Sequence, residues 1–225
     1  MWQVCAKHRK KNGAKIRLIQ KKAVSLCQNN IAVENLIQQF ERNNGFLRTK
    51  DLHSRSDWRN LRKLADSDTI VKIKRGLYRL NDDTIINQHA EIANTIPDGV
   101  FCMFTAWQYY NLSVYNPFEF YVAIRKKQKI VLPKYPPVKL FYWIDDFYLL
   151  GITEGIIDNQ KIKIYDLEKS VCDAIRFRNK IGIDTMSEVI KNYLKRKDKN
   201  LNKLTQYAKI LRIEKTLQTI IMPML

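Results

Sequence analysis

Apolar residues recur clearly at helical spacing just after residue 30. They are three and four positions apart, as on one face of an amphipathic helix. The residues on this face are Ile31, Val33, Leu36, Ile37 and Phe40. Asn43, Asn44 and Gly45 follow, and residues of these types accept the left-handed backbone conformation that ends a helix. The pattern therefore predicts a helix over residues 31–42.

Polar capping residues then predict two shorter helices. Thr49 begins the sequence TKDL, and threonine is a favoured helix N-cap. A turn is expected at residues 53–55. Ser56 is expected to cap the second helix, SDWRNLRKLAD, in which Asp57 complements the positive end of the helix dipole.

The helix that follows Ser56 separates its apolar and basic side chains. One side carries Trp58, Leu61, Leu64 and Ala65, and another carries Arg59, Arg62 and Lys63. We expect the apolar side to dock on the preceding helix while the basic side faces outward. Residues 69–80 then alternate like two strands, and Lys74-Arg75-Gly76 supplies the turn of a basic hairpin.

The order of helix, short helix, basic helix and basic hairpin is that of a winged helix-turn-helix. In that motif the third helix enters the major groove and the hairpin contacts the DNA backbone beside it. We therefore expect residues 31–82 to form a winged helix-turn-helix DNA-binding domain. The alternative is that the helix over 56–66 only presents a solvated charged face. The residues expected to bind DNA are Arg48, Thr49, Lys50, Ser56, Arg59, Arg62, Lys63, Lys72, Lys74, Arg75 and Tyr78.

From residue 84 onward the pattern indicates strands followed by helices. A helix is predicted over 85–95, a short buried strand in GVFCMF, and a helix AWQYYNL capped by Thr105. Strands are predicted over 118–124, 138–144, 147–152 and 161–166. Four striped helices follow, beginning near Leu167, Met186, Leu201 and Ile213. The fold class expected for the whole chain is α+β, with a winged helix-turn-helix followed by a mixed α/β domain over 84–225 that ends in a run of helices.

The basic residues are concentrated in the first third of the chain. The 225 residues include 40 Lys and Arg against 22 Asp and Glu, a formal net charge of +18. Residues 1–80 hold 19 basic and 6 acidic residues, a net of +13. Charge gathered in one segment is typical of a nucleic-acid-binding protein. Residues 1–30 are expected to form a basic N-terminal arm or extension.

Several other classes of protein are disfavoured. The chain has no apolar run of 18 or more residues, and its basic start lacks the apolar segment of a secretory signal. We therefore expect a cytoplasmic protein with no membrane partner. The cysteines form no C-x-x-C pair and the histidines lack zinc-site spacing, so no metal or other cofactor is expected. The cysteines are Cys5, Cys27, Cys102 and Cys172.

The best candidate for an active site is the acidic and basic cluster in YDLEK. Metal-dependent nucleases usually carry an acid and a lysine one residue apart on a strand, so that both point at one metal. Here Glu168 and Lys169 are adjacent at a helix start and point about 100° apart. Asp166 is better interpreted as the N-cap of that helix, and Asp145-Asp146 as a turn between strands. The chain is therefore not expected to be an enzyme, with a winged-helix DNA-processing nuclease as the alternative.

Three stretches of the sequence resemble the AbiEi antitoxins, the regulators of type IV toxin–antitoxin systems in phage defence. The stretch over 45–80, ending in KRGLYRL, is similar to the family's winged helix. KIYDLEKSVCDAI, residues 163–175, is similar to a segment of the family's C-terminal domain. FTAWQYYNL, residues 104–112, resembles a family helix, with Thr105 in place of serine. The basic residues 1–30 lie outside the family pattern.

This resemblance implies an autorepressor that binds inverted repeats in its own promoter. It also implies that the C-terminal domain counters a co-transcribed nucleotidyltransferase toxin without forming a stable complex with it. A stand-alone transcription factor without a toxin is the remaining alternative. The resemblance further suggests an antitoxin surface on the more polar side of the helix after residue 166, although a capped helix with a solvated face is an equal alternative. The residues of that surface are Asp166, Glu168, Lys169 and Asp173.

Overall fold

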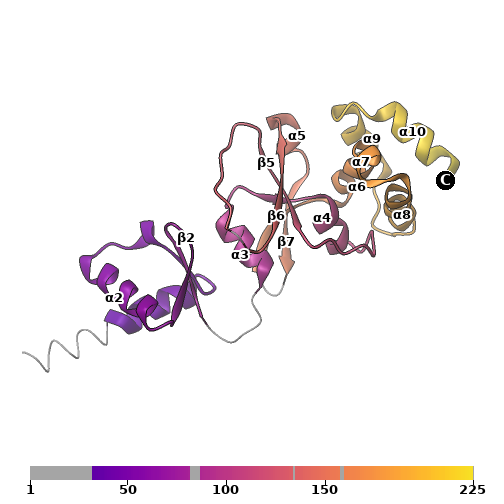
Figure 1. The fold of residues 1–225 in the computed structure, drawn as a ribbon. Coiled ribbons are helices and arrows are strands. Elements are labelled where there is room, and N and C mark those ends of the chain that lie inside the picture. Colours follow the sequence, from indigo (N-terminus) through magenta and orange to yellow (C-terminus); the bar gives the residue numbers. More distant parts are fainter. Residues whose placement is uncertain (1–31, 82–86, 134, 158–159, 225) are drawn as a thin grey trace, which may run out of the picture. The chain divides into compact units, whose positions relative to one another are not determined.

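The described residues form a mixed α and β structure with two β-sheets (Figure 1). The computed structural model describes residues 32–81, 87–133, 135–157 and 160–224. The chain divides into two compact units, Met1–Thr84 and Ile85–Leu225. The expected basic arm over residues 1–30 lies outside the described residues.

The first unit combines helices with a three-stranded antiparallel sheet of order β1-β3-β2. Its elements are a helix over 32–42, β1 (Phe46–Arg48), the 3-10 helix η1 (Thr49–Asp51), α2 (Arg55–Asp66), β2 (Ile70–Lys74) and β3 (Leu77–Leu80). The predicted helix over 31–42 is therefore found from residue 32 onward. Its Leu36 and Phe40 are fully buried in one cluster with Leu61 and Leu64 of α2.

Both predicted N-caps of the first unit are wrong by one or two residues. Ser54, not Ser56, caps α2, and its Oγ accepts a hydrogen bond from the Asp57 backbone N–H at 3.1 Å. The Asp57 carboxylate accepts one from the Ser54 backbone N–H in return, which completes a capping box. Arg48, not Thr49, precedes η1, and it makes no side-chain cap.

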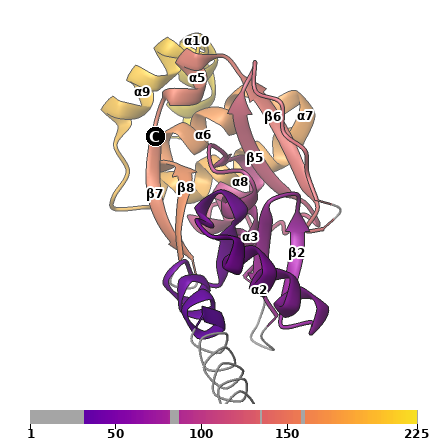
Figure 2. The ribbon, with the colours of Figure 1, turned by 90° about the vertical axis from the view of Figure 1, so that its left-hand side faces the viewer.

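The second unit contains a five-stranded mixed sheet of order β6-β5-β4-β8-β7. The neighbours β5 and β6 run parallel, as do β4 and β8, and the other pairs are antiparallel. Its first elements are α3 (Gln88–Thr95), β4 (Val100–Phe101), α4 (Met103–Tyr109), β5 (Phe120–Arg125), β6 (Val138–Trp143), α5 (Asp145–Leu149), β7 (Ile152–Ile157) and β8 (Gln160–Tyr165). They are followed by α6 (Leu167–Arg176), α7 (Arg178–Ile181), α8 (Ile183–Leu194), α9 (Leu201–Ile210), α10 (Glu214–Ile221) and η2 (Met222–Met224). Figure 2 shows β6 and β7 at the two edges of this sheet.

The sheet is the middle layer of the second unit. Successive side chains of a strand point to opposite faces, so Phe101 and Val122 pack with Ile92 of α3 in one core cluster. Val100 and Ala123 belong to the other cluster, which includes buried residues of α4, α6, α8, α9 and α10. Figure 1 shows α3 on one side of the sheet and these helices on the other.

Three local predictions for the second unit are wrong. Asp145 and Asp146 begin the helix α5, so they do not form a turn, and the expected strand over 147–152 is divided between α5 and the start of β7. Thr105 does not cap α4, because this helix begins at Met103. The Thr105 hydroxyl accepts a hydrogen bond from the Tyr121 backbone N–H at 2.9 Å and so links α4 to β5. The role of Thr105 thus depends on a contact between two elements, which the local sequence pattern does not predict.

Candidate nucleic-acid interface and charge cluster

Helix α2 presents basic side chains away from the core of the first unit. Leu61 and Leu64 are buried, and Arg59, Arg62 and Lys63 are exposed, as the separation of faces predicts. The capping box at Ser54 satisfies backbone groups at the start of this helix and fixes where it begins.

Trp58 is not in the core, contrary to the prediction. Its side chain is 44% exposed, although it lies on the same helix as the buried Leu61. The buried face of α2 consists of Asn60, Leu61 and Leu64. At 100° per residue, Trp58 lies beyond the edge of this face, nearer to Arg62 four positions later. A large apolar ring is thus placed beside basic side chains.

The β2–β3 hairpin is linked to the segment that precedes α2. Gly76 adopts φ +82° in the turn, a left-handed conformation that favours glycine. Its carbonyl accepts a hydrogen bond from the Thr49 backbone N–H at 2.9 Å. A Cβ at residue 76 would lie only 3.1 Å from the Thr49 hydroxyl oxygen. The turn therefore needs glycine both for its conformation and for its close approach to η1.

Arg48 and Lys74 are two positive side chains of this region that lie close enough to affect each other. Partial burial lowers the pKa of Lys74, and the nearby positive charge of Arg48 lowers it further. Both effects disfavour the charged ammonium in the isolated protein.

The structure places the predicted DNA-binding residues on consecutive elements of one unit. Lys50, Arg59, Arg62, Lys63, Lys72 and Arg75 are exposed, whereas Arg48, Thr49, Ser56, Lys74 and Tyr78 are partly buried. Ser56 shares a hydrogen bond of 2.6 Å with the Ser54 hydroxyl, so it supports the helix start. α2 also contacts β2, which brings the basic helix and the basic hairpin together.

A second polar cluster lies at the start of α6. Asp166 is the N-cap of α6, as predicted, and its Oδ1 accepts a hydrogen bond from the Lys169 backbone N–H at 2.8 Å. Its Oδ2 accepts a hydrogen bond from the Tyr207 hydroxyl at 2.9 Å and lies 3.0 Å from the Lys203 ammonium. Asp166 therefore links α6 to α9 as well as capping its own helix.

Glu168 extends the connection between α6 and α9. Its carboxylate lies 3.3 Å from the Lys203 ammonium and accepts a hydrogen bond from the Asn200 backbone N–H at 3.1 Å. Partial burial and then the hydrogen bond to Asp166 raise the pKa of Tyr207 to about 12. Burial lowers the pKa of Lys203, but its contacts with Asp166 and Glu168 outweigh that effect and raise it overall. The ammonium is thus held in its charged form.

Lys169 and Asp173 form an ion pair in the interior, and both side chains are 0% exposed. The Lys169 ammonium lies 2.6 and 2.8 Å from the two Asp173 oxygens and 4.0 Å from the centre of the Trp143 ring. Burial raises the pKa of the Asp173 carboxyl, although the Lys169 charge opposes that shift. The expectation of a solvated polar face here is wrong, because the two opposite charges are neighbours one helical turn apart and are buried together.

The four residues of the expected antitoxin surface therefore do not form one open site. Glu168, Lys169 and Asp173 are buried, and Asp166 is partly buried. In the part of the chain that the structure describes, no group of three or more His, Cys, Asp or Glu residues is placed to hold a metal ion. None of the described helices is long and apolar enough to cross a membrane.

Sequence reasoning did not find the partners of this cluster on α9. Lys203 is not part of the apolar stripe of α9. Tyr207 belongs to that stripe, so the sequence pattern alone marks it only as a residue of the apolar face. Neither position is close in sequence to Asp166, so only the packing of α9 on α6 brings them together. No protein-family model matches the chain, and no match was found among the curated proteins.

Proposed function

We propose that the first unit is a winged helix-turn-helix that binds double-stranded DNA, and that the protein represses its own promoter by binding inverted repeats. The supporting observation is the exposed basic face of α2 beside the basic β2–β3 hairpin. In this proposal α2 enters the major groove, and Lys72, Lys74 and Arg75 contact phosphates. The order of the helix over 32–42, η1, α2 and the hairpin suits this arrangement.

The test is a gel-shift titration of the full chain with its own promoter fragment and with a shuffled fragment of equal length. At about 0.15 M salt we expect the promoter to bind at least about 1,000-fold more tightly, the lower end of specific recognition. Equal affinity for the two fragments would contradict promoter-specific binding. The matched control is Lys195→Ala with Lys197→Ala, because both lysines are exposed in the second unit. This control removes two positive charges and should keep the preference for the promoter.

We further propose that the second unit acts as the antitoxin that counters a co-transcribed nucleotidyltransferase toxin in the cytoplasm, and that the protein is not itself an enzyme. The similarity of residues 163–175 to the antitoxin segment supports this part. Of the four residues of the expected antitoxin surface, Asp166 is partly exposed and the other three are buried. Lys203, whose side chain is 38% exposed, lies beside it. A toxin-related contact at this place would therefore involve the Asp166 carboxylate and the start of α9.

Replacing Asp166 with asparagine tests this surface. Asparagine also caps helices well, so Asp166→Asn should keep the cap of α6. Its amide NH2 would replace the oxygen that accepts a hydrogen bond from Tyr207 and pairs with Lys203, so the variant loses the charge and weakens the link to α9. We expect the variant to lose toxin neutralisation in a co-expression growth assay while its melting temperature stays within a few degrees of wild type. The control is Asp66→Asn, an exposed carboxylate at the end of α2. Full rescue of growth by Asp166→Asn would show that this carboxylate has only a structural role.

A further inference from the structure

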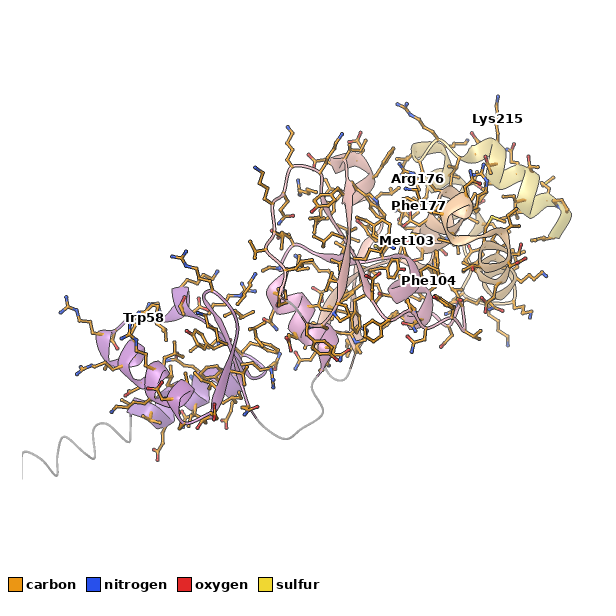
Figure 3. The ribbon with its side chains drawn as sticks, viewed as in Figure 1. Trp58, Met103, Phe104, Arg176, Phe177 and Lys215 are labelled. Carbon is orange, nitrogen blue, oxygen red and sulfur yellow. The ribbon has the colours of Figure 1, made fainter. Side chains whose placement is uncertain are left out.

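Trp58 is a large apolar side chain on the basic face of the proposed DNA-binding helix. Its neighbours one helical turn away are Arg55 and Arg62, and Arg59 follows it directly; all three arginines are exposed. Figure 3 labels Trp58 on α2, and its side chain is 44% exposed. Burying an indole ring is favourable, and the folded chain alone gains only part of that free energy, because much of the ring stays in water. This arrangement suggests that a ligand covers the ring.

The core of the first unit does not use Trp58. The described residues of this core include Leu36, Phe40, Leu61 and Leu64, together with partly buried neighbours such as Tyr78. Trp58 is not a member of this cluster. It is also four positions after the Ser54 cap, in the N-terminal part of α2. In helix-turn-helix proteins the N-terminal residues of the recognition helix contact the base edges.

The major groove contains one apolar group that suits an indole ring, the C5-methyl group of thymine. Arginine side chains pair with the O6 and N7 acceptors of guanine, and they cannot distinguish thymine by its methyl group. We propose that Trp58 contacts thymine methyl groups in the major groove and so determines part of the operator sequence beside Arg59 and Arg62. This inference rests on the proposed insertion of α2 into the major groove.

Removing the thymine methyl groups from the DNA tests this role directly. The promoter fragment is amplified once with dTTP and once with dUTP and primers that contain uracil, which gives the same sequence with uracil in place of thymine. We expect wild-type protein to bind the uracil fragment more weakly by about 4-fold for each methyl group that Trp58 contacts, the value for burying one such group. Trp58→Ala should bind both fragments with equal affinity, and more weakly than wild type binds the thymine fragment.

Two further variants separate this contact from general effects on binding. Arg62→Ala should weaken binding to both fragments but keep the ratio between them. Trp58→Phe keeps an apolar ring and should retain part of the preference for thymine. Circular dichroism checks that each variant is folded, which we expect because these side chains lie outside the core.

The possible failures are distinct. If wild-type protein shows no preference for the promoter over shuffled DNA, both the proposed function and the role of Trp58 are overturned. If it prefers the promoter but binds thymine and uracil fragments equally, only the role of Trp58 is overturned. A thymine preference that persists in Trp58→Ala would assign the methyl contact to another residue. A ring that contacts only the DNA backbone would give weaker binding in Trp58→Ala without any thymine preference in wild type, and that result also contradicts the proposal.

Discussion

Replacing Asp173 with alanine should lower the free energy of unfolding of the second unit by about 3–5 kcal/mol, the usual cost of removing one partner of a buried ion pair. The Lys169 ammonium is 0% exposed and has the two Asp173 oxygens within 2.8 Å. Without that carboxylate, Lys169 must either keep an unpaired charge in the interior or lose its proton. The rings of Trp143 and Tyr165 face the ammonium, but they cannot replace a full negative charge.

Urea unfolding followed by tryptophan fluorescence measures this effect, since Trp107 and Trp143 are buried in the second unit. The double variant Lys169→Met with Asp173→Leu should lose much less stability than Asp173→Ala, because an apolar pair leaves no charge in the interior. The control is Lys161→Ala, whose ion pair with Glu154 spans 3.5 Å with both side chains at least 75% exposed. It should change the stability by less than about 1 kcal/mol. If Asp173→Ala and the double variant lost equal free energy of unfolding, the loss would come from packing and not from an unpaired charge.

The variant with both Arg59→Ala and Arg62→Ala should lose about 2–6 kcal/mol of binding free energy for the promoter, since each arginine that contacts a guanine contributes about 1–3 kcal/mol. The two side chains are exposed on α2, so the folded structure should not depend on them. Because they would contact base edges, the variant should also lose most of its preference for the promoter over shuffled DNA, and keep only the part that Trp58 supplies. Unchanged promoter affinity in a gel-shift titration would contradict the placement of α2 in the major groove.

The basic residues of the hairpin should behave differently. Lys72→Ala, Lys74→Ala and Arg75→Ala should each weaken binding to promoter and shuffled DNA by similar factors. Each should also reduce the slope of log affinity against log salt by about one, because each would release one phosphate contact. A loss of sequence preference in a hairpin variant would show that the hairpin also contacts bases.

The local sequence pattern predicts a structural feature correctly where the residues of a single helix or turn determine that feature. The apolar stripe after residue 30 predicts a helix over 31–42, which the structure shows from residue 32 onward, and a glycine at residue 76 predicts the hairpin turn. The cap at Asp166 was also predictable, because a carboxylate before an amphipathic stripe satisfies the free N–H groups of the helix it precedes. Each of these features depends on neighbours within a few residues.

The rest was decided by contacts between distant segments. The sequence alone could not show that Lys169 and Asp173 are buried, because both are polar and their burial depends on each other and on the rings of β6 and β8. Nor could it place Lys203 beside Asp166, since α9 reaches α6 only through the packed core of the second unit.

Trp58 illustrates the limit of hydrophobic pattern most clearly. The sequence determined that it lies on an amphipathic helix, but burial follows from which face the rest of the first unit covers. That face carries Asn60, Leu61 and Leu64, and it ends before reaching the indole ring. Helix formation depends on local spacing and capping, whereas the burial of one side chain depends on the shape of everything packed against it.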